Sequence, residues 1–210
     1  MQEMMRVSVV PFFESHSKHF IKHTSLMTAG IGESTLAEKI GETRDFLPSG
    51  STLAFLPHSA GVRLRVSTKG DDFQTVQNEN AQVVNFLKER IGAALYATTD
   101  MTLEQHIANL LKARGLSIST AESCTGGLIA NRLTNVPGSS EYFQQGFITY
   151  SNEAKQKTLG VSQETLLKFG AVSEETAREM AIGCVEKTGC DLAISTTGVA
   201  GPDGGTETKP

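Results

Sequence analysis

The sequence contains few of the residues that mark several large classes of protein. It has three cysteines among 210 residues, Cys124, Cys184 and Cys190, and no pair of them has CxxC spacing. The odd count and the spacing argue against a disulfide framework and against a zinc site. A free cysteine in or beside a helix behaves as a small hydrophobic residue. We therefore expect neither a disulfide scaffold nor a bound metal.

Long apolar runs are also missing. No window of about 18 residues is continuously apolar, so we expect no transmembrane helix. Residues 1–13 lack the apolar run and small-residue cleavage site of a signal peptide. The net charge of −4 and the sequence pI of about 5.8 argue against a nucleic-acid partner, which usually requires a basic surface. These absences predict a cytoplasmic protein that binds neither membranes nor nucleic acid.

The hydrophobic pattern of the first hundred residues predicts a small α+β unit. Apolar and polar residues alternate over 62–68, as in a half-buried strand, and shorter strands are predicted at 52–56 and 93–98. A helix is predicted at 32–41, and a longer helix over 73–91 has an apolar stripe and a glycine directly after it. This order of elements favours an antiparallel sheet.

Three histidines near the N-terminus are candidate metal ligands. His16, His19 and His23 have i, i+3, i+7 spacing and could share a helix face, and Phe20 fits the same helical pattern. Neutral imidazole is a good ligand for zinc or nickel. Only Glu14 lies nearby to complete a ligand set, so a packed or solvated helix is favoured over a metal site.

The second half alternates between strand and helix patterns. This order favours an α/β layered domain with a largely parallel sheet. Gly115 and Gly160 follow two of the helices, and Ser162 and Ser173 are placed to cap two more. Strands are predicted at 116–120, 147–150 and 191–196, and helices include 125–135 and 151–159.

The segment Thr-Ala-Glu-Ser-Cys-Thr-Gly-Gly at 120–127 lies where a strand ends and a helix begins. Ligands of open α/β sheets bind beyond the carboxyl ends of strands. Two glycines let a ligand approach the backbone, and free amides there could bind a phosphate or form an oxyanion hole around Ser123. The local pattern alone favours a plain helix cap, because Ser and Thr are common N-caps.

A second strand-to-helix junction contains Tyr150 and Lys155. A lysine with a pKa lowered by burial can act as the base for a serine, and a tyrosine could relay the proton. For the local pattern alone, a solvated surface lysine at a helix start is the commoner case. No histidine follows His106, so the second half cannot contain a Ser-His-Asp triad. Cys124 is a rival nucleophile, but it too lacks a local histidine.

A glycine-rich loop follows the last predicted strand, at 196–205. Such loops form anion-binding concavities from successive N–H groups, although a flexible turn is an equal alternative. The loop lacks both the GxGxxG and GxxxxGK[ST] patterns. No further strand or helix follows it, so we expect the domain to be C-terminally truncated.

These three elements together resemble the C-terminal domain of the CinA family, an amidase of the PncC type. The segments that carry the resemblance are TAESCTGG at 120–127, PGSS at 137–140, GFITYSNEAK at 146–155, GAVSEETAREMA at 170–181 and TGVAGPDGG at 197–205. The resemblance spans residues 101–210 and implies hydrolysis of nicotinamide mononucleotide to nicotinic acid mononucleotide and ammonia. It implies no metal and no cofactor, and it suggests a homodimer.

The resemblance also implies roles for individual residues. Ser123 would be the nucleophile, Lys155 the general base, and Tyr150 would assist proton transfer. The residues expected to contact the substrate or support the dyad are Ser140, Thr197, Thr125, Gly126, Gly127, Gly198 and Gly201.

The first half is similar to the middle, KH-like domain of the same family, most clearly at 30–40, GIGESTLAEKI. The expected organisation is a connection from an N-terminal domain at 1–24, a small α+β domain at 25–98 and an incomplete amidase domain at 101–210. Residues 25–98 contain no GxxG loop, so we expect no RNA binding there. The alternative to an amidase is a non-catalytic fragment or scaffold. The family's nucleotide pyrophosphatase activity is disfavoured, because the acidic metal cluster of that domain is absent from the sequence.

Overall fold

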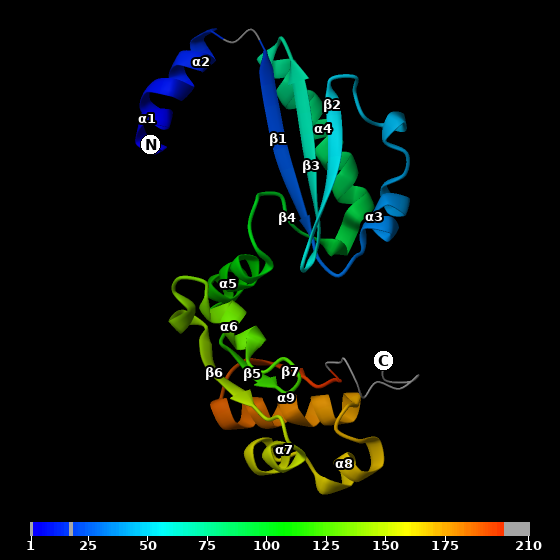
Figure 1. Cartoon of the computed structure of the whole chain (residues 1–210), viewed down its shortest axis with the longest axis vertical. Coiled ribbons are helices and arrows are strands. Elements are labelled where there is room, and N and C mark those ends of the chain that lie inside the picture. Colours follow the sequence, from blue (N-terminus) through cyan, green and yellow to red (C-terminus); the bar gives the residue numbers. More distant parts are fainter. Residues whose placement is uncertain (1, 17–18, 200–210) are drawn as a thin grey trace. The chain divides into compact units, whose positions relative to one another are not determined.

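The computed structural model describes residues 2–16 and 19–199. The chain divides into two compact units, Met1–Leu103 and Glu104–Pro210 (Figure 1). None of the helices within the described residues combines the length and the apolar character that crossing a bilayer requires.

The first unit is built on a four-stranded sheet. Its strands are β1 (Phe20–Thr28), β2 (Ser51–His58), β3 (Gly61–Gly70) and β4 (Leu95–Ala97). Their order is β2-β3-β1-β4, and all three pairings are antiparallel. The predicted antiparallel α+β unit is therefore confirmed.

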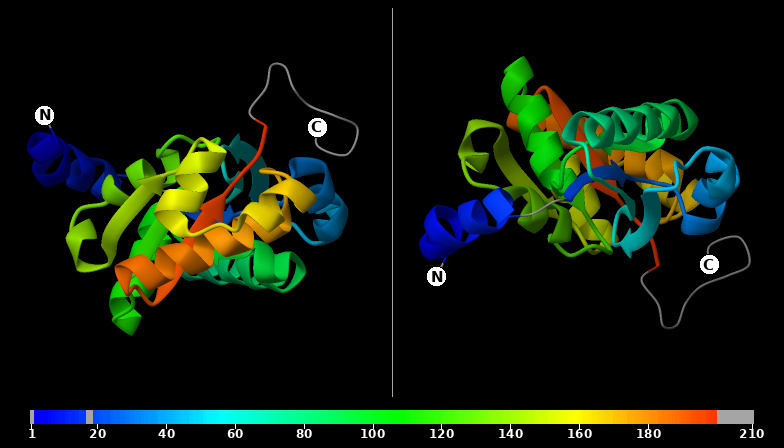
Figure 2. Two further views of the ribbon diagram at one scale, coloured as in Figure 1. Left: turned by 90° about the horizontal axis from the view of Figure 1, so that it is seen from below. Right: turned by 90° about the horizontal axis from the view of Figure 1, so that it is seen from above.

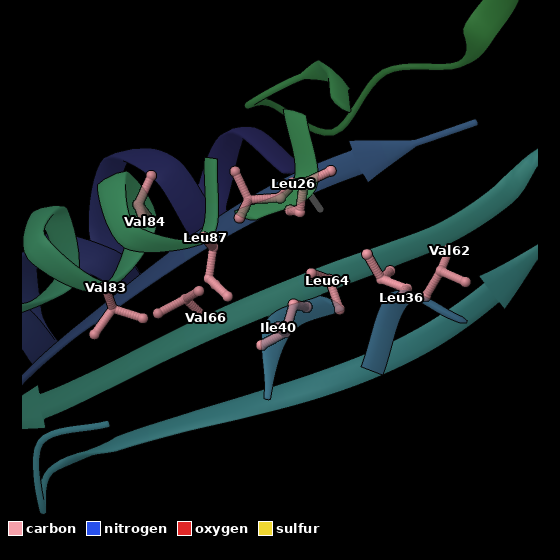
Figure 3. Packing of buried hydrophobic residues seen from close by; sticks show 10 residues of the cluster. Leu26, Leu36, Ile40, Val62, Leu64, Val66, Val83, Val84 and Leu87 are labelled. Carbon is pink, nitrogen blue, oxygen red and sulfur yellow. The ribbon is translucent and has the colours of Figure 1, made fainter. Parts of the chain in front are cut away.

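Two helices complete this unit. Helix α4 (Phe73–Ile91) packs on β1 and β3, and α3 (Glu33–Ile40) packs against α4. Asp72 caps α4 by accepting a hydrogen bond from the Thr75 amide at 2.7 Å. Alternate residues of β3 face the core, which Figure 3 shows from close by. The buried cluster comprises Leu26, Leu36, Ile40, Val62, Leu64, Val66, Val83, Val84, Leu87 and Ile91.

The region before the sheet differs from the sequence prediction. Helices α1 (Gln2–Met4) and α2 (Val10–His16), with a π-helical turn between them at Met5–Val9, precede β1. The helical pattern inferred for Phe20 and His23 is wrong, because both residues belong to β1, which pairs with β3 from Phe20 to Met27. The His23 Nδ1 atom lies 2.8 Å from the Ser67 hydroxyl on β3. Cross-strand pairing here overrides the local spacing, so the histidines do not share a helix face.

The second unit contains a three-stranded parallel sheet. Strand β5 (Ile118–Glu122) lies in the centre, between β6 (Phe143–Ile148) and β7 (Leu192–Thr196). The predicted α/β class with a parallel sheet is confirmed. The strand expected at 147–150 begins earlier, at Phe143. Most residues at the start of β6 are exposed, so the sequence shows no apolar run there.

Helices cover both faces of this sheet. Ile118 faces a cluster with Ala108, Leu111 and Leu133 from α5 and α6, whereas Ala121, three residues later in β5, faces a second cluster on the side of α7, α8 and α9. Figure 2 shows α9 running alongside β7. The helices of this unit are α5 (Leu103–Arg114), α6 (Leu128–Thr134), α7 (Asn152–Leu159), α8 (Gln163–Phe169) and α9 (Glu174–Thr188).

The predicted helix caps in this unit are present. The Ser162 hydroxyl accepts from the Thr165 amide at 3.0 Å, and the Ser173 hydroxyl accepts from the Thr176 amide at 3.2 Å. Short 3₁₀ turns occur at Thr43–Asp45 and Gly92–Ala94 in the first unit and at Ser139–Glu141 in the second.

Candidate active site

Ser123 follows directly on the last residue of the central strand β5. Its backbone amide donates to the Thr196 carbonyl at the end of β7, at 3.0 Å. On the other side, the Thr149 amide, just beyond β6, donates to the Glu122 carbonyl at 2.8 Å. The Ser123 side chain is thus held between the carboxyl ends of both neighbouring strands, the edge at which α/β sheets bind ligands.

Lys155 reaches this edge from the first turn of α7. The Ser151 hydroxyl caps that helix by accepting from the Ala154 amide at 3.0 Å, which fixes where α7 begins. The Lys155 side chain is only 1% exposed. Its Nζ atom lies 2.9 Å from Ser123 Oγ, 2.8 Å from the Thr149 carbonyl oxygen and 3.0 Å from the Tyr150 carbonyl oxygen.

The surroundings of Lys155 favour its neutral form. Burial lowers the pKa of the Lys155 amine, and the electrostatic effect of the nearby Cys124 sulfur offsets only part of this shift. A neutral amine has two hydrogens and one lone pair. The two carbonyl oxygens can only accept, so they take both hydrogens. The lone pair is then left for the Ser123 hydroxyl, which is the arrangement that a general base requires.

Glu122, which the sequence analysis did not single out, lies beneath the turn that carries Ser123 and leads into α6. It is completely buried, and its carboxylate accepts hydrogen bonds from the amides of Gly127, Ile129 and Ala130 at 3.0, 3.0 and 2.8 Å. An acidic residue five positions before a glycine-started helix is the sequence signal that could have identified it.

The two glycines of the turn adopt backbone conformations that other residues rarely adopt. Gly126 and Gly127 have φ angles of 59° and 97°, in the left-handed region that favours glycine. The Gly126 amide donates to the Ser123 carbonyl at 3.1 Å, and the Gly127 amide is bound by Glu122. Both amides are therefore used within the turn.

Several of the other predicted substrate contacts gather at this edge. The Thr125 and Thr196 hydroxyls are 2.8 Å apart, and the Thr197 hydroxyl donates to the Ala171 carbonyl at 2.7 Å. A Cβ atom added to Gly198 would lie 3.2 Å from the Cys124 sulfur, so these two residues are neighbours. Gly201 lies outside the described residues.

Ser140 is placed elsewhere. It is exposed in the 3₁₀ turn Ser139–Glu141, which precedes β6. Because β6 runs parallel to β5, residues before β6 lie at the amino edge of the sheet, whereas Ser123 lies at the carboxyl edge. The structure of one chain does not bring Ser140 to the Ser123–Lys155 pair.

Tyr150 contacts the pair through its backbone. Its carbonyl oxygen accepts from Lys155, whereas its side chain is 76% exposed.

Among the described residues, no side-chain cluster of three or more His, Cys, Asp or Glu is arranged to hold a metal ion.

Comparison with known proteins agrees with this architecture. Residues 100–210 match the model of the CinA C-terminal domain, and residues 23–97 match that of the damage-inducible protein CinA KH domain. A CinA-like protein of Chloroherpeton thalassium is 79% identical over the whole chain, which covers 50% of that relative. A CinA-like protein of Chlorobium limicola is 56% identical, with 49% of it covered. The chain thus spans about half the length of these curated relatives.

Solved structures point the same way. The competence/damage inducible protein CihA of Agrobacterium tumefaciens is 50% identical with a TM-score of 0.50, over 51% of this chain and 66% of that chain. The competence damage-inducible protein A (ComA) of Klebsiella pneumoniae is 42% identical with a TM-score of 0.50, over 51% and 67%. The two family models together account for most of the sequence, and the chain belongs to the CinA family.

Proposed function

We propose that the second unit is an amidohydrolase that converts nicotinamide mononucleotide to nicotinic acid mononucleotide and ammonia. The observation that carries the chemistry is the 2.9 Å contact between Lys155 Nζ and Ser123 Oγ, with the other contacts of the amine made to carbonyl oxygens. The substrate is proposed from the resemblance of the sequence motifs to the amidase domain of the CinA family.

The first half-reaction forms an acyl-enzyme. Ser123 Oγ attacks the carboxamide carbon while its proton passes to the Lys155 amine. The tetrahedral intermediate collapses when Lys155 returns that proton to the leaving nitrogen, which departs as ammonia. The nicotinoyl group is then held as an ester on Ser123.

The second half-reaction uses the same two groups in reverse. Neutral Lys155 takes a proton from water, and the resulting hydroxide equivalent attacks the ester carbon. The proton returns to Ser123 Oγ as the carboxylic acid product leaves, and this acid then ionises by releasing its own proton to solvent. Tyr150 assists by holding the Lys155 amine through its carbonyl oxygen, and Thr125, Thr197 and Gly198 line the edge at which the substrate would lie.

The test is ammonia release from nicotinamide mononucleotide, with the nucleotide product identified by chromatography. The chain, its Ser123→Ala variant and the Chloroherpeton thalassium relative are assayed side by side. Hydrolysis by the chain that is lost in Ser123→Ala supports the proposal. Hydrolysis by the relative alone would make this chain a non-catalytic fragment, and no hydrolysis by either protein would contradict the proposed reaction.

A further inference from the structure

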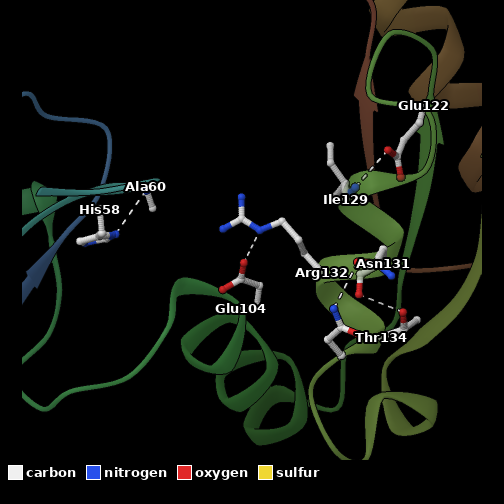
Figure 4. A network of polar contacts seen from close by, with 9 residues as sticks. His58, Ala60, Glu104, Glu122, Ile129, Asn131, Arg132 and Thr134 are labelled. Carbon is white, nitrogen blue, oxygen red and sulfur yellow. Dashed lines mark hydrogen bonds and ion pairs between the residues drawn. The ribbon is translucent and has the colours of Figure 1, made fainter.

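The buried carboxylate of Glu122 has no part in the steps proposed above. It is 0% exposed and lies under the turn that carries Ser123. Its two oxygens accept the amide hydrogens of Gly127, Ile129 and Ala130, and Figure 4 shows the bond from Ile129. One side chain therefore takes up the donors at the start of α6.

Glu122 takes up these donors as an anion. Burial raises the pKa of its carboxyl, but the hydrogen bonds to the charged form, led by that of the Ala130 amide, outweigh burial and hold the pKa below its ordinary value. Hydrogen bonds to a charged acceptor are roughly twice as strong as neutral ones. The turn is thus fixed at its C-terminal end by a strongly bound carboxylate.

Most of the amides around this turn have acceptors. The amide of Ser123 donates to Thr196, that of Gly126 to Ser123 and that of Leu128 to Thr125. The amides of Gly127, Ile129 and Ala130 donate to the Glu122 carboxylate. Within the described residues, the backbone amides of Cys124 and Thr125 have no hydrogen-bond acceptor. They follow the nucleophile directly, and the amide after the nucleophile is a recurrent oxyanion donor in serine hydrolases.

On the basis of the proposed function, we propose that Glu122 is a positioning residue for the oxyanion hole. Its carboxylate holds the turn so that the Cys124 and Thr125 amides remain free to donate to the carbonyl oxygen of the substrate. When Ser123 attacks, the electron pair of the carbonyl bond moves to that oxygen, and these two N–H groups stabilise its negative charge. The donors at the start of α6 do not take part, because Glu122 occupies them.

Glu122→Gln tests this role. The variant keeps the side-chain shape but replaces one acceptor oxygen with an NH₂ group, which faces backbone donors. Loss of one oxyanion donor costs about 100-fold to 1,000-fold in kcat, so a misplaced turn is expected to lower kcat by about 10-fold to 100-fold. KM is expected to change by less than about threefold, because the interaction forms in the transition state. The midpoint of the pH profile, set by Lys155, should stay in place.

A matched control is Ser162→Ala, which removes the cap of α8 away from the site. It should lower thermal stability and leave kcat unchanged, which separates loss of stability from loss of positioning. A kcat in folded Glu122→Gln equal to that of the wild type would overturn the inference and leave the proposed function standing. Should Glu122→Gln fail to fold, the kcat of Glu122→Asp is compared with that of the wild type instead, with the same two outcomes. No hydrolysis by the wild type would overturn the proposed function, and this inference with it.

Discussion

The Lys155 amine lies 2.9 Å from the Ser123 hydroxyl, and its two remaining contacts are carbonyl oxygens of Thr149 and Tyr150. Neither carbonyl can donate a hydrogen bond, so a neutral Lys155 has its lone pair available only toward Ser123. This arrangement also keeps a lysine in the core at 1% exposure without a carboxylate partner among its hydrogen bonds. The predictions for Ser123, Lys155 and Tyr150 rest on this contact between the amine and the hydroxyl.

The first prediction separates the two adjacent nucleophiles. Ser123→Ala should abolish hydrolysis, because it removes the atom that contacts Lys155. Cys124→Ala should keep kcat within about threefold of the wild type, because the contact of Lys155 is with the serine oxygen. Ammonia release measured on both variants checks this. Turnover that remains in Ser123→Ala would contradict the assignment of Ser123 as the nucleophile. A loss of turnover in Cys124→Ala but not in Ser123→Ala would contradict it as well.

The second prediction concerns pH. Burial lowers the pKa of Lys155 from 10.5, and only the neutral amine can accept the serine proton. The value of kcat/KM should therefore rise with pH up to a plateau, with its midpoint below 10.5. Lys155→Met should lose at least about 100-fold in kcat, the usual contribution of a general base. A midpoint at or above 10.5 would show that Lys155 is not the titrating base.

The same shift predicts a dependence of stability on pH. Between the lowered pKa and 10.5, the folded Lys155 is neutral while the unfolded one is protonated, so unfolding takes up a proton. The contribution of Lys155 to the free energy of unfolding should therefore rise with pH across that window. This contribution is measured by denaturant unfolding of the wild type and of Lys155→Met at several pH values, as the difference between their free energies of unfolding. A difference that stays constant with pH would contradict a lowered pKa.

The third prediction concerns the part of Tyr150 that acts. Its carbonyl oxygen binds Lys155, whereas its side chain is 76% exposed and its hydroxyl has no hydrogen-bond partner among the described residues. Tyr150→Phe keeps the carbonyl and should lower kcat by less than about tenfold, with the pH midpoint unchanged. The pH profile of this variant is the measurement. A larger loss would assign proton transfer to the hydroxyl instead.

The sequence was sufficient to predict elements with strong local signals. The caps at Ser162 and Ser173 and the long helix 73–91 were found because each depends on residues close together in the chain. Strand β1 was missed because its hydrogen bonds are made to β3, about forty residues later in the chain, and local spacing does not show them. The start of β6 was missed because its exposed residues lack an apolar pattern.

The candidate site was partly predictable for similar reasons. Ser123 and Lys155 were suggested by their places at strand-to-helix junctions, but their contact depends on the parallel pairing of β5 and β6. The spacing of Glu122 before the glycine-started helix marks it in the sequence, but its three bonds to the amides of Gly127, Ile129 and Ala130 are known only from the fold. The same pairing places Ser140 at the opposite edge, which no motif spacing reveals.

The last prediction tests how closely α7, which carries Lys155, is packed against α9. A Cβ atom added to Gly183 of α9 would lie 1.8 Å from the carbonyl oxygen of Leu159, the last residue of α7, so one backbone must move. Gly183→Ala should lower the free energy of unfolding by about 1–3 kcal/mol and should also lower kcat, because the shift displaces Lys155. Ile182→Ala, at a neighbouring side chain that is 52% exposed, is the control and should change stability by less than about 0.5 kcal/mol. Denaturant unfolding and the ammonia assay measure both variants, and wild-type values for Gly183→Ala would show that α7 does not depend on this close approach.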